Sequence, residues 1–362
     1  MGISSVLGTG ALVPAGYGFR NLVINGAMQV AQRGTSASGL GTVTAYYTAD
    51  RWQTNLGSIG TWTQTIENDA PTGSGFRKSL KMLCTTANSS LASSAEGQIW
   101  QKFEGQNLQS IKKGTASAEQ VTLSFWVKSN VTGTRVVELY DGDNTRQCSK
   151  SYTVDASGTW EKKVITFPAD TTGAFDNDNA LSLYCLFWLA AGTNFTSGTL
   201  GTTWSSATSA NRAVGQVNTA AATNNYWQIT GVQMEVGPVA TAYEFKPIDV
   251  ELRQCKRYYT TRTDKDNTGG GSGTGSLVAR FKFDDEMRVA PTASIRTAGS
   301  FIVGNDYSAN YTATTVTLNS YQGGPCVTRT GLGGFASYPG NGVFVAQSDA
   351  SGTAVFQFDS EL

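Results

Sequence analysis

The chain of 362 residues is predicted to be an all-β protein whose longer part is an antiparallel β-sandwich. Three observations support this fold class. Short apolar runs recur between turns rich in Gly, Asn and Asp. The composition includes 41 glycines and 10% aromatic residues, which suits strands joined by tight turns. Charged residues make up 15% of the chain, well below the roughly 25% of an average soluble domain.

The strands are expected where apolar residues alternate or run continuously. In residues 120–130, Val121, Leu123, Phe125 and Val127 share one face, as a half-buried strand requires. Residues 181–192 are almost continuously apolar, which favours a central strand of the sandwich. The other clear runs are 97–105, 135–142, 160–169 and 225–237.

The length and the distribution of tryptophan predict two domains. All eight tryptophans lie between Trp52 and Trp227, and a chain of this length is expected to form more than one core. We place the first domain at residues 21–247 and the second at 263–362. Between them, residues 248–262 are predicted to form a short connecting helix. Pro247 and Asp249 stand at its start and basic residues near its end, as the helix dipole favours.

Residues 264–276 are rich in Gly and Ser and read either as a flexible linker or as a hairpin loop. We favour the loop, because strand-like sequence lies on both sides of it. The runs that follow, 276–283, 294–303, 311–321 and 352–362, predict a small β-sandwich. At the other end, residues 1–20 carry no charge before Arg20. They are either an unstructured terminus or an arm that docks on another protein.

Several classes of function are excluded by composition. The chain has no histidine, so Ser-His-Asp and Cys-His catalysis and His-based zinc sites are impossible. Lys plus Arg and Asp plus Glu both number 27, which leaves no basic surface for nucleic acid. No apolar stretch is long enough to span a membrane. The five cysteines have no CxxC pair and are expected to be buried thiols of a chain made in a reducing cytoplasm: Cys84, Cys148, Cys185, Cys255 and Cys326.

Binding rather than catalysis is expected, because no spacing selects a pair of carboxylates for glycoside hydrolysis. Aromatic side chains outside the strands are the candidates for stacking on a sugar ring. The tryptophans inside predicted strands, Trp100 among them, are expected to pack in the core. The candidate ligand-binding residues are Trp62, Trp204 and, in the Gly-rich loop 320–341, Tyr321, Arg329, Phe335 and Tyr338.

Three blocks of sequence resemble one family. These are "NLVINGAMQVAQRGTS" with "YYTADRWQ" (21–36 and 46–53), "ITGVQMEVGPVATAYEFKPIDVELRQCKRYY" (229–259) and "FKFDDEMRVAPTASI" (281–295). Their order and spacing resemble a recurrent domain of tailed-bacteriophage tail fibres and related virion appendages. The resemblance implies a jelly-roll first domain like a carbohydrate-binding module. In it, "INGAMQVAQRG" is the first strand, and Trp52 lies in the core.

The resemblance also implies a function and partners. The protein is expected to be a virion tail appendage, assembled in the cytoplasm of a bacterial host as a homotrimer. Residues 1–20 would bind other virion proteins, and the chain would attach to host surface polysaccharide. A head fibre or capsid decoration protein and an exported bacterial carbohydrate-binding protein are the alternatives. No cofactor is expected. Related modules hold calcium with acidic residues where this chain has Ala27 and Gln29, which leaves Glu235 as a single ligand.

Overall fold

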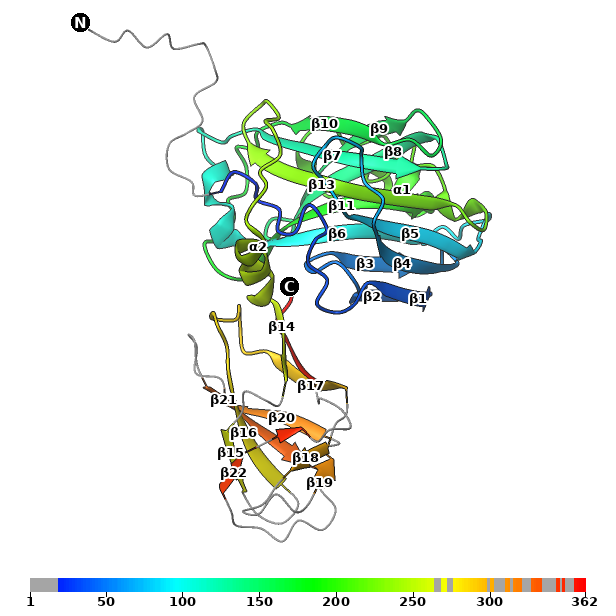
Figure 1. Cartoon of the computed structure of the whole chain (residues 1–362). Coiled ribbons are helices and arrows are strands. Elements are labelled where there is room, and N and C mark those ends of the chain that lie inside the picture. The colour runs from blue at the N-terminus through cyan, green and yellow to red at the C-terminus, as the bar shows by residue number, and fades with distance from the viewer. Residues whose placement is uncertain are drawn as a thin grey trace, which may run out of the picture.

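The computed structural model describes residues 19–263, 268–271, 276–297, 300–302, 310–312, 315–320, 327–333, 343–345, 347–348 and 355–362. Most of the predicted arm (residues 1–18) lies outside the described residues. In Figure 1 the longer part of the chain forms two packed sheets, and a smaller β part follows beneath α2.

The longer part is a sandwich of two antiparallel sheets, which confirms the predicted all-β fold class. The six-stranded sheet runs, in spatial order, β1 (Ser36–Leu40), β4 (Thr61–Glu67), β5 (Ser79–Thr86), β13 (Tyr226–Val236), β7 (Val121–Ser129) and β10 (Glu161–Phe167). The seven-stranded sheet runs β12 (Ser205–Ser206), β9 (Arg146–Val154), β8 (Gly133–Asp141), β11 (Leu181–Ala191), β6 (Glu96–Glu104), β3 (Gln53–Gly57) and β2 (Val43–Tyr46). β11 is the central strand of this sheet, as its apolar sequence predicts. The short helices are η1 (Gly105–Asn107), η2 (Gln109–Ile111), α1 (Thr193–Thr196), η3 (Ser209–Asn211) and η4 (Thr219–Ala221).

The core lies between the two sheets and is organised around Phe187 of β11. Its ring centroid lies 5.1 Å from that of Phe125, 5.8 Å from Trp227 and 6.2 Å from Trp52. All four side chains have an exposed fraction of 0%. Large aromatic side chains from both sheets therefore fill the sandwich, and Trp52 is buried as predicted.

The prediction of a first strand in "INGAMQVAQRG" is wrong. Residues 19–35 contain no strand. Asn25 and Met28 have φ angles of 58° and 57°, in the left-handed region, so the segment winds tightly instead of extending. It still packs on the sandwich, because Leu22 N donates to Met234 O (2.9 Å) and Val232 N donates to Gly26 O (3.0 Å).

The connecting helix is shorter than predicted. α2 spans Ile248–Lys256, and residues 259–262 belong instead to β14 (Tyr259–Thr263). β14 pairs along its whole length with β24 (Val355–Asp359). This partner lies about a hundred residues further along the chain, so a local helical pattern gave no sign of it.

The second part of the chain is built from three small antiparallel sheets. The first has the order β14, β24, β17 (Thr292–Thr297). The second has the order β20 (Thr315–Ser320), β21 (Val327–Gly333), β16 (Ser276–Lys282), β15 (Thr268–Gly271), β22 (Val343–Val345). The third has the order β19 (Asn310–Thr312), β18 (Ser300–Ile302), β23 (Gln347–Ser348). β15 lies inside the Gly-rich segment 264–276, so this segment is neither a plain linker nor a single long loop.

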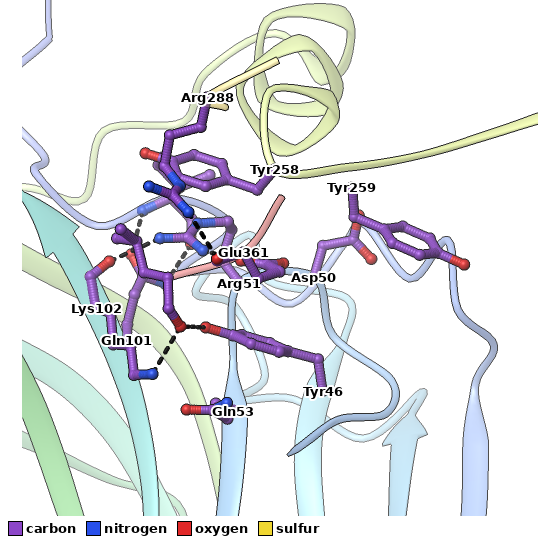
Figure 2. A network of polar contacts seen from close by, with 12 residues as sticks. Tyr46, Asp50, Arg51, Gln53, Gln101, Lys102, Tyr258, Tyr259, Arg288 and Glu361 are labelled. Atoms are coloured by element: carbon purple, nitrogen blue, oxygen red, sulfur yellow. Dashed lines mark hydrogen bonds and ion pairs between the residues drawn. The ribbon is translucent and has the colours of Figure 1, made fainter. Parts of the chain in front are cut away.

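The end of the chain returns to the sandwich and forms the junction between the two parts (Figure 2). The Glu361 carboxylate pairs with Arg51 and Arg33, whose side chains are 1% and 10% exposed. Arg288 donates to the carbonyl oxygens of Ser360 (2.7 Å) and Glu361 (2.9 Å). Lys102 Nζ donates to the Leu362 carbonyl oxygen at 2.6 Å. We call Arg33, Arg51, Arg288 and Glu361 the junction cluster.

In the described part of the chain, no helix has the length and apolar character needed to cross a membrane.

Candidate functional site

Trp62, one of the predicted ligand-binding residues, lies in the core. Its side chain is 0% exposed, and its Nε1 donates to Ile59 O at 3.0 Å. Trp62 points inward on the same face of β4 as buried Gln64, and Thr61 and Thr63 on either side of it are less buried. The prediction that Trp62 binds a ligand is therefore wrong.

Trp204 is partly buried against the core, and its Nε1 donates to Pro168 O at 2.9 Å. Its ring lies over Lys113, whose Nζ is 5.2 Å from the ring centroid. The ring is thus held in the sandwich edge. Of the candidates in loop 320–341, Tyr321, Phe335 and Tyr338 lie outside the described residues. Arg329 is placed by its backbone on β21.

Aromatic side chains instead gather on the outer face of the seven-stranded sheet. Trp100 on β6, Tyr140 on β8 and Tyr184 on β11 are each partly exposed. Their neighbours Ile99, Leu139 and Cys185 point into the core, so alternation turns these three rings outward. Tyr184 lies directly opposite Tyr140 on one side and Lys102 on the other.

The three rings form a continuous aromatic surface, which we call the aromatic face. The Tyr184 ring centroid lies 5.6 Å from that of Trp100 and 5.8 Å from that of Tyr140. Both contacts are edge-to-face, with interplanar angles of 67° and 73°. Edge-to-face packing of this kind is a favourable arrangement for aromatic pairs.

Amide side chains lie beside the aromatic face on β3 and β6. Gln53 stands opposite Trp100 and accepts a hydrogen bond from its Nε1. In the next row, Asn55 Nδ2 donates to Gln98 Oε1 at 2.6 Å. Thr44 Oγ1 on β2 continues the row by donating to Asn55 Oδ1 at 2.6 Å. Gln53, Asn55 and Gln98 are themselves buried, with 7%, 7% and 1% exposed, and exposed Thr44 is the polar group at the end of this row.

The segment that carries α1 and η3 bounds the aromatic face on the β8 side. Arg212 lies with its guanidinium carbon 5.0 Å from the Tyr140 ring centroid and pairs with Glu138 (2.8 Å). Glu138 is 0% exposed, and burial raises its pKa although the Arg212 charge opposes the shift. Trp188 Nε1 also donates to Glu138 at 3.1 Å. The Glu138 carboxylate therefore stabilises the fold by binding Arg212 and Trp188.

Lys102 bounds the face on the other side. Its Nζ lies 5.9 Å from the Trp100 ring centroid and 5.7 Å from that of Tyr184. Burial and the neighbouring charge of Arg51 lower the pKa of Lys102 to about 8. Figure 2 shows Lys102 beside Arg51 and Glu361, so the aromatic face ends at the junction cluster.

The residues of the "NGAMQ" segment do not form a metal centre in the described structure. Glu235, the expected remaining ligand, accepts hydrogen bonds from Thr241 N (2.8 Å), Thr241 Oγ1 (2.8 Å) and Gln233 Nε2 (2.9 Å). Among the described residues, no group of three or more His, Cys, Asp or Glu side chains is placed to hold a metal ion.

The sequence contained a signal for the aromatic face that our core assignment of Trp100 overlooked. In the run 97–105, Ile99 and Phe103 are the apolar residues at alternate positions, so Trp100 between them must face the opposite way. The same reasoning applies to Tyr184 between Leu183 and Cys185. The informative observation was a tryptophan at one of the alternate strand positions that face away from the core.

No protein-family model matches this chain, and no curated protein matches it. Solved structures resemble part of the chain. The active domain of tailspike protein 4 of bacteriophage CBA120 is 15% identical, with 60% of this chain and 21% of that chain covered and a TM-score of 0.32. A family 4 carbohydrate-binding module is 10% identical. The match covers 59% of this chain and 97% of the module, with a TM-score of 0.30. The family 11 carbohydrate-binding module of Clostridium thermocellum Lic26A-Cel5E is 12% identical. The match covers 57% of this chain and 98% of the module, with a TM-score of 0.30.

Proposed function

We propose that this chain is a virion appendage protein of a tailed bacteriophage, of the tail-fibre type, which attaches to host cells by binding surface glycan. The observation that carries the glycan part is the aromatic face. Trp100, Tyr184 and Tyr140 are partly exposed and contiguous, and amide groups lie beside them. Apolar ring faces with adjacent hydrogen-bonding groups suit pyranose rings.

The virion part of the proposal rests on the three ordered sequence blocks. The first two describe segments that touch in the fold, since Asn25 N donates to Glu251 Oε1 and Gln32 Nε2 donates to Tyr259 O at 2.8 Å. These two blocks are thus parts of one packed unit. On this proposal residues 1–20 bind another virion protein, and the chain works as a homotrimer. Repeated copies raise weak single-site affinity through effective concentration.

We further propose that the protein binds its glycan without cleaving it. Glu138 is fully buried and held by Arg212 and Trp188, so it is unavailable as an acid or nucleophile. Hydrolysis requires two carboxyl groups that both reach the glycosidic bond.

The test is a comparison of Trp100→Ala with Trp126→Ala in the full-length protein. Trp126 is the matched control, because it is partly exposed on the outer face of the other sheet. Binding is measured by affinity electrophoresis in gels that contain purified host polysaccharides. We expect Trp100→Ala to weaken binding at least ~10-fold, equivalent to about 1.4 kcal/mol, and Trp126→Ala to leave it unchanged.

Blocking of phage adsorption by excess wild-type protein, and loss of that blocking in Trp100→Ala, would support the attachment role. Equal binding by both variants would refute the aromatic face as the site. A folded protein that neither binds a host polysaccharide nor blocks adsorption would favour the alternative of a purely structural appendage, such as a head fibre.

A further inference from the structure

A lysine is enclosed by oxygen atoms at the edge of the sandwich. Lys113 follows η2, and its side chain is 2% exposed. Its Nζ lies 2.5 Å from Asp141 Oδ2, 2.6 Å from the Gly173 carbonyl oxygen, 3.0 Å from the Thr172 carbonyl oxygen and 3.1 Å from Asp170 Oδ2. We call these four oxygens the oxygen cage.

The cage surrounds Nζ as ligands surround an ion: three of its oxygens accept hydrogen bonds from the ammonium, and Asp170 Oδ2 is a fourth oxygen paired with it. An ammonium group has three N–H donors, whereas four oxygens lie within 3.1 Å of Lys113 Nζ. Two carboxylate and two main-chain carbonyl oxygens are ligands that Ca²⁺ takes in proteins. The carbonyl oxygen of residue 173 is placed by a backbone conformation that requires glycine. Gly173 has a φ of +72°, and a Cβ there would lie 2.6 Å from Asn144 Cγ.

The cage is balanced in charge while the lysine is present. Arg146 binds Asp170 through two hydrogen bonds of 2.8 and 2.9 Å, and Asn144 Nδ2 donates to Asp141 at 3.0 Å. Two carboxylates therefore face two cations. Without the lysine charge, one buried carboxylate would be left uncompensated, and buried unpaired charges are strongly unfavourable. A small pocket lined in part by Lys113, Asp170, Phe175 and Trp204 lies beside this position.

We propose that the Lys113 ammonium is the resident cation of a calcium-type site, and that the cage binds Ca²⁺ once this lysine is removed. The lysine joins three segments of chain, residues 111–114, 141–144 and 170–173, in the way a structural metal ion would. The wild-type fold is then independent of added metal.

The experiment measures the melting temperature of the full-length chain in EDTA and in Ca²⁺, for wild type and for Lys113→Ala. We expect wild type to melt at the same temperature in both solutions. Lys113→Ala is expected to melt roughly 10 °C lower in EDTA and to recover most of that loss in Ca²⁺. Lys112→Ala is the matched control, because Lys112 is 49% exposed and pairs with exposed Glu119. It should show no Ca²⁺ effect.

Two further variants separate the cage from a general effect of calcium. Lys113→Met removes the charge but keeps the side chain in the cage, so it should be destabilised and insensitive to Ca²⁺. Adding Asp141→Asn to Lys113→Ala should abolish the recovery. Terbium gives a direct readout, since Trp204 lies 5.2 Å from the cage centre and would sensitise emission from bound Tb³⁺ in Lys113→Ala alone.

A Lys113→Ala protein that melts equally in EDTA and Ca²⁺, or that fails to fold in both, would overturn the proposal. Sensitised Tb³⁺ emission from wild type equal to that from Lys113→Ala would also overturn it, because the ion would then bind elsewhere.

Discussion

Asn25 shows how one side chain organises the segment that opens the described structure. Its φ of 58° lies in the left-handed region, which Asn tolerates better than most residues. Nδ2 donates to Val30 O (2.8 Å) and Asp50 O (3.0 Å), and Oδ1 accepts from Val30 N (2.9 Å). The Asn25 carbonyl accepts from Trp52 Nε1 at 3.1 Å. The "NG" and "DRW" parts of the first block are therefore linked by direct hydrogen bonds.

Asp50, in the same block, predicts a dependence of stability on pH. The carboxylate is 0% exposed, and burial raises its pKa from 3.8 to about 6, although hydrogen bonds from Gln32 and the charge of Arg33 oppose the shift. The folded state therefore holds this proton more tightly than the unfolded state does. The resulting stabilisation is complete below pH 3.8 and is lost as the pH rises through about 6.

The measurement is the free energy of unfolding of wild type minus that of Asp50→Asn, by urea denaturation between pH 4.5 and 7.5. We expect this difference to rise by about 2 kcal/mol from pH 7.5 to pH 4.5, because other titrating groups cancel in the subtraction. A difference that stays constant over this range would show that the pKa of Asp50 is not raised.

At this scale the sequence predicts which residues share a face but not what covers that face. Because Ile99 and Phe103 occupy the core-facing positions of this strand, the sequence alone predicts that Trp100 faces outward. Trp62 lies in loop-like surroundings in the sequence, yet it is buried, because Gln64 shares its inward face and bonds to Thr48 and Thr54. A buried glutamine hides the alternation that would have marked this strand.

At the scale of single elements, β13 depends on a bulge at Gly231. Its pairing register with β7 breaks between Thr230 and Gln233. Gly231 has a φ of +62°, and a Cβ on it would lie 2.5 Å from Phe76 Cζ. The bulge directs the backbone of Val232 toward residues 21–26, where its N–H donates to Gly26 O and its carbonyl accepts from Asn21 Nδ2 (3.1 Å).

Gly231→Ala is therefore expected to destabilise the fold by about 2–4 kcal/mol, through backbone strain and overlap with the Phe76 ring. Gly39→Ala is the matched control. Gly39 has a similar φ of +69°, but a Cβ there would meet nothing within 4 Å. It should lose only ~1 kcal/mol, the cost of the backbone conformation alone. Chemical denaturation measures both, and equal losses would contradict a steric role for Phe76.

The existence of elements was more predictable than their ends and partners. Local apolar patterns, alternating or continuous, located β6, β7, β8, β10, β11 and β13, because each strand carries its own pattern. The helix began beside Pro247 as expected but stopped at Lys256, since Tyr259 pairs with Asp359. The strand β15 within a Gly-rich segment gave no apolar signal at all.

At the scale of the whole molecule, the junction cluster ties the two parts of the chain together. Glu361 is 5% exposed and faces Arg51 and Arg33. Arg51 also lies under Tyr258, with its guanidinium carbon 3.4 Å from the ring centroid. Complementary charges that are more than three hundred residues apart cannot be paired from one sequence, so this contact was not predicted.

We expect Glu361→Gln to lower the free energy of unfolding by about 3–5 kcal/mol, because it leaves Arg51 buried without its carboxylate. Asp285→Asn serves as the control. Its partner Arg253 lies 3.4 Å away and is 72% exposed, so this change should cost less than ~1 kcal/mol. Calorimetry of both variants gives the comparison. A Glu361→Gln protein as stable as Asp285→Asn would show that the junction contributes little.

The chain crosses the junction twice, outward at Arg257–Tyr259 and back at Asp359–Glu361, and the two crossings are joined by Ser360 Oγ donating to Arg257 O at 3.0 Å. A single connection would let the smaller part swivel about it. Two connections side by side resist twisting, and a pull on the smaller part is divided between them. We therefore expect the paired crossings to hold the smaller part more stiffly than a single strand would, so that a force applied to it reaches the sandwich.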